Sequence, residues 1–331
     1  MNAMDSRNRI FYLDAIRAFA IIAILVVHTL DYYWDTRTEL FSKMYFGSAA
    51  LFFMTSGALI FPITRAGAFI RRRLSSYLPQ FVIWTIAYAL MGYWLWDGDY
   101  LLGKQLLWML YTPTWSAGWF LYALTGLYLF APFISPWLAS ASKRSVEWFL
   151  LAWIIAGTVP LAAVQTPFTT AETIFAPFYG FLGFMVAGHY LARWPIFSRP
   201  RKERVAFFAV TILIGVLFAA RAFVTAWRWG FAETLDYDLS LNVMAMCVLW
   251  FAVFQSFRHA PAFITKAITL VSVCSLEIYL CHVAWLDYLI IPLQMNIWVA
   301  IAMTLTLAIL TAVALRWISS RIRHLFPLKF R

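Results

Sequence analysis

Of the 331 residues in the chain, 63% are hydrophobic and only 12% are charged. A soluble domain is nearer half apolar and a quarter charged, so this composition excludes an ordinary soluble protein and indicates an all-α polytopic membrane protein. The formal net charge is +11, but the basic residues cluster in alternate predicted loops, which indicates membrane topology and not nucleic-acid binding. We therefore expect membrane lipids, and no nucleic acid, among the partners.

Hydropathy along the chain predicts about ten transmembrane helices. They cover residues 11–31, 44–63, 77–96, 116–137, 146–164, 172–192, 205–226, 239–257, 268–290 and 294–317. The first lacks a small-residue cleavage site, so we interpret it as a retained span and not as a signal peptide. Lysine and arginine are enriched in every second loop and at both ends, so the positive-inside rule places both termini in the cytoplasm. The spans 11–31 and 268–290 then run in the same, outward direction.

The first predicted span carries polar side chains on or near one stripe. From Arg17 to His28 the helix makes three turns plus roughly 20°, which separates the two side chains by about 16 Å along the axis. Asp14, three residues before Arg17, is positioned to pair with it. Charged groups facing lipid cost on the order of 2.5–3.5 kcal/mol each, so we expect the stripe to face a tunnel inside the protein. Asp31 or Asp35 is expected to orient the His28 ring.

A basic cluster of Arg71, Arg72 and Arg73 precedes the third predicted span. Guanidinium groups match phosphate oxygens in geometry and charge, so the cluster suits a phosphate-bearing ligand at the cytoplasmic end. Two ordinary explanations stay open, because such arginines also mark the cytoplasmic side of a membrane protein or contact lipid headgroups.

The late span 268–290 holds a second set of polar residues. Ser275, Tyr279 and His282 share one helical face at positions i, i+4 and i+7. This face either lines a cavity or makes interhelical hydrogen bonds. Glu277 points roughly the other way, so we expect its partner on another helix.

Three further side chains are candidates with an ordinary alternative. Ser56 suits a cavity wall or helix packing. Trp119 and Tyr122 suit a platform for a sugar ring, but aromatic residues also form belts at membrane interfaces.

The cysteines lie in apolar segments without paired spacing, so we expect neither a disulfide framework nor a metal site.

Five short segments follow one another through the chain. They are Leu13–Ala18 followed by His28, Phe52–Gly57, Phe69–Arg73 ahead of Pro79, Trp119–Leu124 with Pro132, and Ser275–His282. Together they resemble the acyltransferase-3 family of integral-membrane acyltransferases, which implies a single transmembrane acyltransferase domain over residues 1–331. The likeness is greatest to the branch without a fused periplasmic domain, such as the enterobacterial common antigen O-acetyltransferase. Where the family often has a second arginine before the proline, this chain has Ser76, which leaves Arg71 or Arg72 as a substitute.

The resemblance implies transfer of an acyl group, usually acetyl, from cytoplasmic acetyl-coenzyme A to a hydroxyl of a glycan or lipid-linked sugar on the outer side of a bacterial inner membrane. His28 is then either the general base or a transient carrier of the acyl group. Arg17 and the cluster of Arg71, Arg72 and Arg73 would contact the donor. The residues expected on the acceptor side are His282, Tyr279, Trp119, Tyr122, Ser56 and Glu277.

A transporter or flippase of a lipid-linked sugar is the alternative, since it would use the same polar stripe as a substrate path. Such proteins often have broken helices in matching halves of the chain. The sequence has no such pairing, which favours the enzyme.

Overall fold

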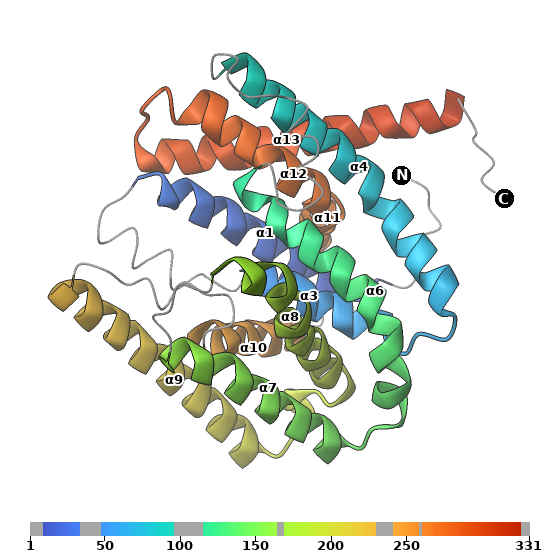
Figure 1. Ribbon diagram of the computed structural model, residues 1–331, viewed down its shortest axis with the longest axis vertical. Helices are drawn as coiled ribbons and strands as arrows, with labels where there is room; N and C mark the ends of the chain where they lie inside the picture. Colours follow the sequence, from blue (N-terminus) through green and yellow to red (C-terminus); the bar gives the residue numbers. More distant parts are fainter. Residues whose placement is uncertain are drawn as a thin grey trace. The chain divides into compact units, whose positions relative to one another are not determined.

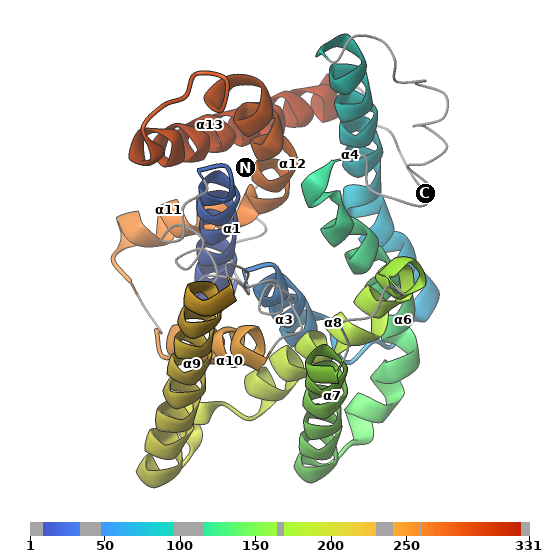
Figure 2. The same ribbon diagram turned by 60° about the vertical axis from the view of Figure 1, so that its left-hand side comes forward.

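The computed structural model describes residues 9–33, 48–95, 115–163, 169–229, 241–257 and 260–325 (Figures 1 and 2). Within these ranges every regular element is a helix, which confirms the predicted all-α class. The chain divides into two compact units, Met1–Ser42 with Phe257–Arg331 and Lys43–Ser256. They are called the terminal unit and the central unit below.

Helices occur in all of the stretches that hydropathy predicts. The terminal unit contains α1 (Phe11–Asp31), α11 (Ala262–Val273), α12 (Ser275–Trp285), the π-helical η4 (Leu286–Ile290) and α13 (Ile297–Leu325). The central unit contains α3 (Ser48–Ile60), α4 (Ala66–Leu95), the 3-10 helix η1 (Ser116–Gly118), α6 (Trp119–Ser140), α7 (Lys143–Ala163), α8 (Thr169–Arg193), the 3-10 helix η2 (Ile196–Ser198), α9 (Arg201–Trp229) and α10 (Leu241–Gln255).

Fewer helices than predicted meet the length and hydropathy required of a membrane span. Among the described residues, four helices are long and apolar enough to cross a bilayer: α1, α4, α6 and α13. The bent pair of α11 and α12 makes a fifth if it is counted as one span. The described part of the chain thus has four or five candidate membrane spans, and the count of ten stays a prediction.

The stretch 268–290, predicted as one continuous helix, is broken. The α11 axis and the α12 axis are bent by 68° from one another. Between them Cys274 has φ −87° and ψ 3°, outside the α-helical region. The prediction of an uninterrupted helix was wrong because neither proline nor glycine marks this break.

The arginine cluster lies inside a helix and not in a loop before one. α4 begins at Ala66 and continues through Pro79, so Arg71 to Arg73 occupy its first turns. The predicted start at residue 77 was wrong for two physical reasons. Arginine is a good helix former, and helices of membrane proteins tolerate an internal proline.

Within the terminal unit, α1 packs against α11, α12 and α13. Polar contacts join α1 to the α11–α12–η4 segment in the same order along both, from Asp14 with Ser272, through His28 with His282, to Tyr32 with Asp287. The two segments therefore run in the same direction, as predicted from the loop charges, and the outward sense of that direction stays a prediction. Farther along, Leu286, Ile290 and Ala300 form a buried apolar core between η4 and α13.

Two glycines allow the close crossing of α3 and α8 in the central unit. A Cβ atom on Gly57 would overlap the backbone carbonyl of Met185, and one on Gly188 would overlap that of Met54. Small residues let membrane helices approach this closely. This crossing places the fully buried side chain of Phe53 in the core.

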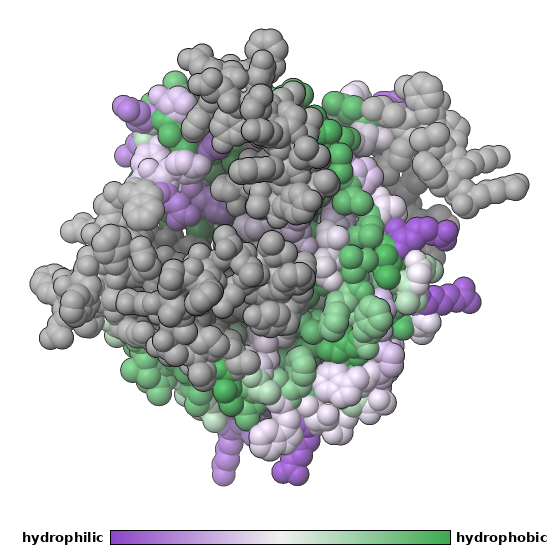
Figure 3. Space-filling view, in the orientation of Figure 1, coloured by the Kyte–Doolittle hydropathy of each residue, from purple (hydrophilic) through white to green (hydrophobic). Residues whose placement is uncertain are grey.

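Large apolar side chains are exposed over much of the described surface. Figure 3 shows broad green areas of hydrophobic residues, with purple hydrophilic side chains in a few places. Among the exposed hydrophobic residues are Phe133, Trp148 and Trp298. Continuous apolar surface is unfavourable in water, so these side chains fit contact with lipid.

Candidate functional site

Two histidine side chains meet between α1 and α12 in the terminal unit. Nδ1 of His28 lies 2.8 Å from Nε2 of His282, and the ring centroids are 5.0 Å apart. The other nitrogen of His282, Nδ1, lies 2.6 Å from the backbone oxygen of Tyr279. His282 is fully buried, whereas His28 is half-buried. A backbone carbonyl, a buried imidazole and a more accessible imidazole thus form one hydrogen-bonded chain.

The partners in this chain determine where the protons lie. A carbonyl oxygen only accepts hydrogen bonds. Nδ1 of His282 therefore carries a proton and donates a hydrogen bond to the backbone carbonyl of Tyr279. If His282 is neutral, its Nε2 has a lone pair and accepts the Nδ1–H of His28. The opposite assignment would place a positive charge on a fully buried ring, which is costly. A neutral His28 therefore has its lone pair on Nε2, the nitrogen that is not bonded to His282.

This arrangement suits two kinds of chemistry. Nε2 of His28 can accept a proton from a hydroxyl group, with His282 maintaining the reactive tautomer. Alternatively, the same lone pair can attack an acyl carbonyl. In both cases His282 acts through His28, and the predicted contact of His282 with an acceptor stays a prediction.

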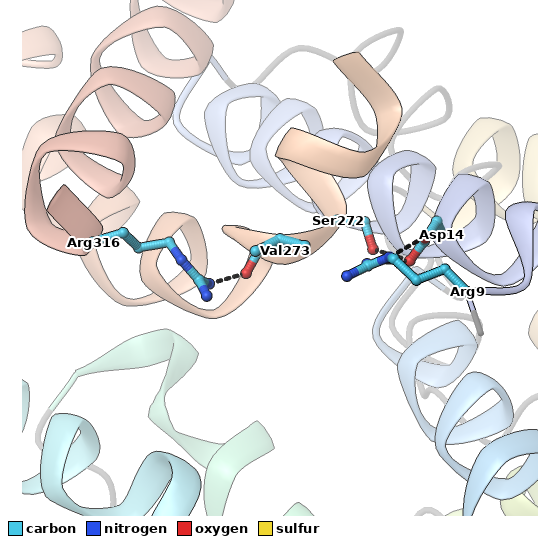
Figure 4. A network of polar contacts seen from close by, with 5 residues as sticks. All are labelled: Arg9, Asp14, Ser272, Val273 and Arg316. Atoms are coloured by element: carbon cyan, nitrogen blue, oxygen red, sulfur yellow. Dashed lines mark hydrogen bonds and ion pairs between the residues drawn. The ribbon is translucent and has the colours of Figure 1, made fainter. Parts of the chain in front are cut away.

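A polar network surrounds the break between α11 and α12 (Figure 4). Asp14 accepts hydrogen bonds from Nε and Nη2 of Arg9, at 2.8 and 2.6 Å, and from Oγ of Ser272 at 2.8 Å. Arg316 of α13 donates to the backbone carbonyl of Val273. The carbonyls in the last turn of a helix have no partner within that helix, so Arg316 satisfies one of them.

Glu277 on α12 is buried and pairs with α13, where Nη1 of Arg316 lies 3.2 Å from its Oε2. This confirms the prediction that its partner lies on another helix. Its predicted contact with the acceptor stays a prediction. The sequence analysis missed Arg316, although a single arginine inside an apolar predicted span was the signal that could have identified it.

Arg17 and His28 lie on one uninterrupted helix, as predicted, and both are half-buried. Asp14 belongs to the network of Figure 4, and its predicted pairing with Arg17 stays a prediction, as does the tunnel. Asp31 is exposed at the last position of α1, and its role in orienting His28 is still to be tested. Asp35 lies outside the described residues.

The arginine cluster belongs to the central unit, and its members differ in their surroundings. Arg71 and Arg72 are exposed, whereas Arg73 is half-buried. The guanidinium carbon of Arg73 lies 5.7 Å from the centre of the Phe69 ring and 5.6 Å from that of Tyr128. Contact with ring faces orients a guanidinium group while its N–H donors stay available at the edge. Arg73 is therefore the most constrained of the three.

Ser56, Trp119 and Tyr122 also lie in the central unit, among aromatic rings. Oγ of Ser56 is buried, 3.4 Å from a tyrosine hydroxyl of α6. Trp119 stacks on Phe181 with ring centroids 5.4 Å apart, and Tyr122 meets Phe81 edge-on at 5.2 Å. Their predicted contact with a sugar stays a prediction.

Comparison with known families matches nearly the whole chain. A family model described as an acyltransferase domain matches residues 10–317. The chain belongs to the acyltransferase-3 family. The match runs through the terminal and central units, including the helices that carry the histidine pair and the arginine cluster. Comparison with curated proteins and with solved structures finds no match.

Membership of the acyltransferase-3 family makes the chain a membrane acyltransferase. It confirms the family predicted from the five segments and does not favour the transporter alternative.

Sequence analysis of this acyltransferase-3 protein also missed Tyr32 and Asp287. The hydroxyl of Tyr32 donates a hydrogen bond to the carboxylate of Asp287. Along both segments, this pair is the next polar contact after the histidine pair. Two signals could have found them. Tyr32 follows His28 by four residues, and Asp287 is an acid within a predicted span.

Proposed function

We propose that the chain is an O-acetyltransferase that moves the acetyl group of cytoplasmic acetyl-coenzyme A to a hydroxyl of a glycan or lipid-linked sugar on the outer side of a bacterial inner membrane. Ten spans with both termini in the cytoplasm would give the enzyme access to both compartments. The alternation of basic loops supports this topology. The likeness to the branch without a fused periplasmic domain supports the glycan acceptor.

The hydrogen-bonded chain from Tyr279 through His282 to His28 carries the proposal. The acceptor hydroxyl gives its proton to Nε2 of His28 while its oxygen attacks the thioester carbonyl carbon. The C–S bond of the tetrahedral intermediate then breaks, and His28 returns the proton to the sulfur of coenzyme A. His282 keeps the Nδ1–H of His28 bonded throughout, so that Nε2 stays the basic atom.

The arginine side chains are proposed to bind the donor. Arg73 has a guanidinium group oriented by two rings, and the exposed Arg71 and Arg72 add positive charge beside it. Such a group suits the phosphates of coenzyme A. Arg17 keeps its charge at any physiological pH, and we assign it to the pantetheine arm or a phosphate of the donor.

The residues proposed to bind the acceptor differ in how far their side chains are buried. Trp119 and Tyr122 are half-buried, so part of each ring is accessible for stacking against a sugar. Ser56, Tyr279 and Glu277 are buried, which supports a positioning role for them.

Label transfer from radioactive acetyl-coenzyme A to the glycan and glycolipid fraction of membranes tests the proposal. His28→Ala is expected to lower the initial rate by about 10²- to 10⁴-fold, the range for loss of a general base. His189→Gln is the matched control, because His189 is a buried histidine of the central unit that packs against Phe61. Unchanged transfer by His28→Ala at equal protein level would reject the proposed site.

A further inference from the structure

A second polar pair follows the histidine pair between the same two segments of the terminal unit. The phenol of Tyr32 donates a hydrogen bond to Oδ1 of Asp287. Tyr32 lies four residues after His28, about 6 Å farther along the helix direction. Asp287 lies five residues after His282, within η4.

A π-helical turn begins at this point of the segment. In η4 the N–H of Ile291 bonds to the carbonyl of Leu286, a step of five residues in place of four. Asp287 lies within this turn, where its carboxylate meets Tyr32. Single π-turns inside helices occur often at functional sites.

The two pairs differ in their access to solvent. His282 is fully buried, whereas Tyr32 is 45% exposed and Asp287 is half-buried. By direction along α1, the Tyr32–Asp287 pair lies beyond the histidines on the outward side of the proposed topology. A molecule that approaches His28 from the outside would meet this pair first.

The chemistry of the pair suits hydroxyl groups. A carboxylate accepts at two oxygens with about four lone-pair sites, and Tyr32 uses one of them. The phenol oxygen of Tyr32 can also accept a hydrogen bond while its proton is held by Asp287. Neighbouring hydroxyls of a sugar can therefore donate to Asp287 and Tyr32 together.

We propose that Tyr32 and Asp287 form a binding site for the sugar acceptor. They would hold hydroxyls on one side of the ring while a hydroxyl on the other side reaches Nε2 of His28. This inference rests on the proposed function, since it assigns the acceptor subsite of the same reaction. It makes Asp287 a specificity residue for polyhydroxylated acceptors and leaves the activation of the hydroxyl to His28.

The central unit offers a matched control. There Tyr190 donates a hydrogen bond to Oε1 of Glu147 at 2.5 Å, so it is also a tyrosine–carboxylate pair. That pair is held by cations, because Arg199 donates to the Tyr190 hydroxyl at 2.7 Å and Lys143 lies 3.8 Å from Glu147. A polar network of this kind has a structural role, so Glu147→Gln reports the general effect of neutralising such a carboxylate.

The experiment measures two fates of the acetyl group with each variant. One assay follows radioactive acetyl transfer to the membrane glycan and glycolipid fraction. The other follows release of the coenzyme A thiol by the purified full-length protein with water as the only acceptor. Asp287→Asn is expected to lower transfer to glycan by about ten- to a hundredfold, the range for one hydrogen bond to a charged group, and to leave thiol release within about twofold. Tyr32→Phe is expected to give a smaller selective loss.

Three other results would contradict the proposal that Tyr32 and Asp287 bind the acceptor. Unchanged glycan transfer by Asp287→Asn would remove Asp287 from acceptor binding, and an equal fall in both assays would make the pair a support for His28 instead. A selective loss of the same size in Glu147→Gln would also reject it. Failure of the proposed function itself looks different, because His28→Ala would then retain transfer and thiol release alike.

Discussion

The candidate residues of the terminal unit and those of the central unit are held by different kinds of contact. In the terminal unit, polar side chains from separate helices bond directly to one another, as in the pairs His28–His282 and Arg316–Glu277. In the central unit, Arg73, Trp119 and Tyr122 contact aromatic ring faces and edges.

This difference fits two tasks of the proposed acetyl transfer. Directional hydrogen bonds fix the tautomer and orientation of a group that must exchange a proton. Ring contacts fix the position of a cation or a flat surface without using all its donors, which suits the binding of a ligand. We therefore assign proton transfer to the terminal unit and most of the donor binding to the central unit. The following variants, ordered from the largest expected effect, test this assignment.

His282→Leu tests whether the terminal unit controls a proton. Without the bond from His28 Nδ1, the ring of His28 can rotate and adopt the other tautomer, so we expect acetyl transfer to fall by about 10²- to 10⁴-fold with little change in the KM for acetyl-coenzyme A. His282→Gln offers a carbonyl oxygen to the same Nδ1–H and should recover part of the rate. Steady-state kinetics with labelled donor measure both.

The control for His282 is Cys281→Ala on the same helix, because the Cys281 thiol is buried and bonds to the backbone of Ala308. It should retain the wild-type rate within a few-fold. A His282→Gln protein as slow as His282→Leu would show that hydrogen bonding to His28 is not what His282 provides.

Gly57→Ala tests the scaffold that positions the aromatic contacts of the central unit. The added methyl group would overlap the Met185 carbonyl, so α3 and α8 must separate, at a cost of about 1–3 kcal/mol or more. Thermal unfolding in detergent should show a clear fall in Tm. At Gly67 nothing lies within 4 Å of an added Cβ, so Gly67→Ala should leave Tm unchanged or slightly higher.

Arg316→Met tests the polar network that holds the broken helix. The substitution leaves the Val273 carbonyl and the buried carboxylate of Glu277 without this donor. We expect a loss of about 1–3 kcal/mol in the free energy of unfolding, at the lower end because the Arg316 side chain is 41% exposed and water screens the pair. Arg321→Met on the same helix removes an exposed arginine that lies over the Trp317 ring, and it should lower Tm less than Arg316→Met does. Equal Tm values for the two variants would mean that the break does not depend on Arg316.

Arg73→Ala tests donor binding by the central unit. We expect the KM for acetyl-coenzyme A to rise by about ten- to a hundredfold, since one charge-assisted hydrogen bond to phosphate is lost, with kcat little changed. The exposed Arg71 should matter less, so Arg71→Ala is the comparison within the cluster. A fall in kcat without a change in KM would move Arg73 from donor binding to the chemical step.

Much of the fold follows from local patterns that the sequence displays. Apolar stretches of sufficient length predict the helices, and α1 has the predicted bounds of 11–31. The break at Cys274 does not follow, because it depends on partners from α1 and α13 that are distant in sequence. The start of α4 was missed for a different reason, because arginines continue a helix and a membrane helix tolerates an internal proline.

The candidate site was predictable as a list of residues and not as a set of contacts. His28 and His282 both stand out as polar groups in apolar helices. Their mutual hydrogen bond requires the packing of α1 on α12, which a single sequence does not reveal. Asp287 lies in the π-turn of η4, whose sequence contains no glycine or proline to mark it.

The central claim is that the two imidazoles of the terminal unit act as one unit in proton transfer. A double-mutant cycle of acetyl-transfer rates, with His28→Ala, His282→Leu and the double variant at equal protein level, measures this directly. The account predicts that the double variant is no slower than His28→Ala alone, because His282 acts only through His28. Losses that multiply in the double variant would contradict it, since each histidine would then contribute independently.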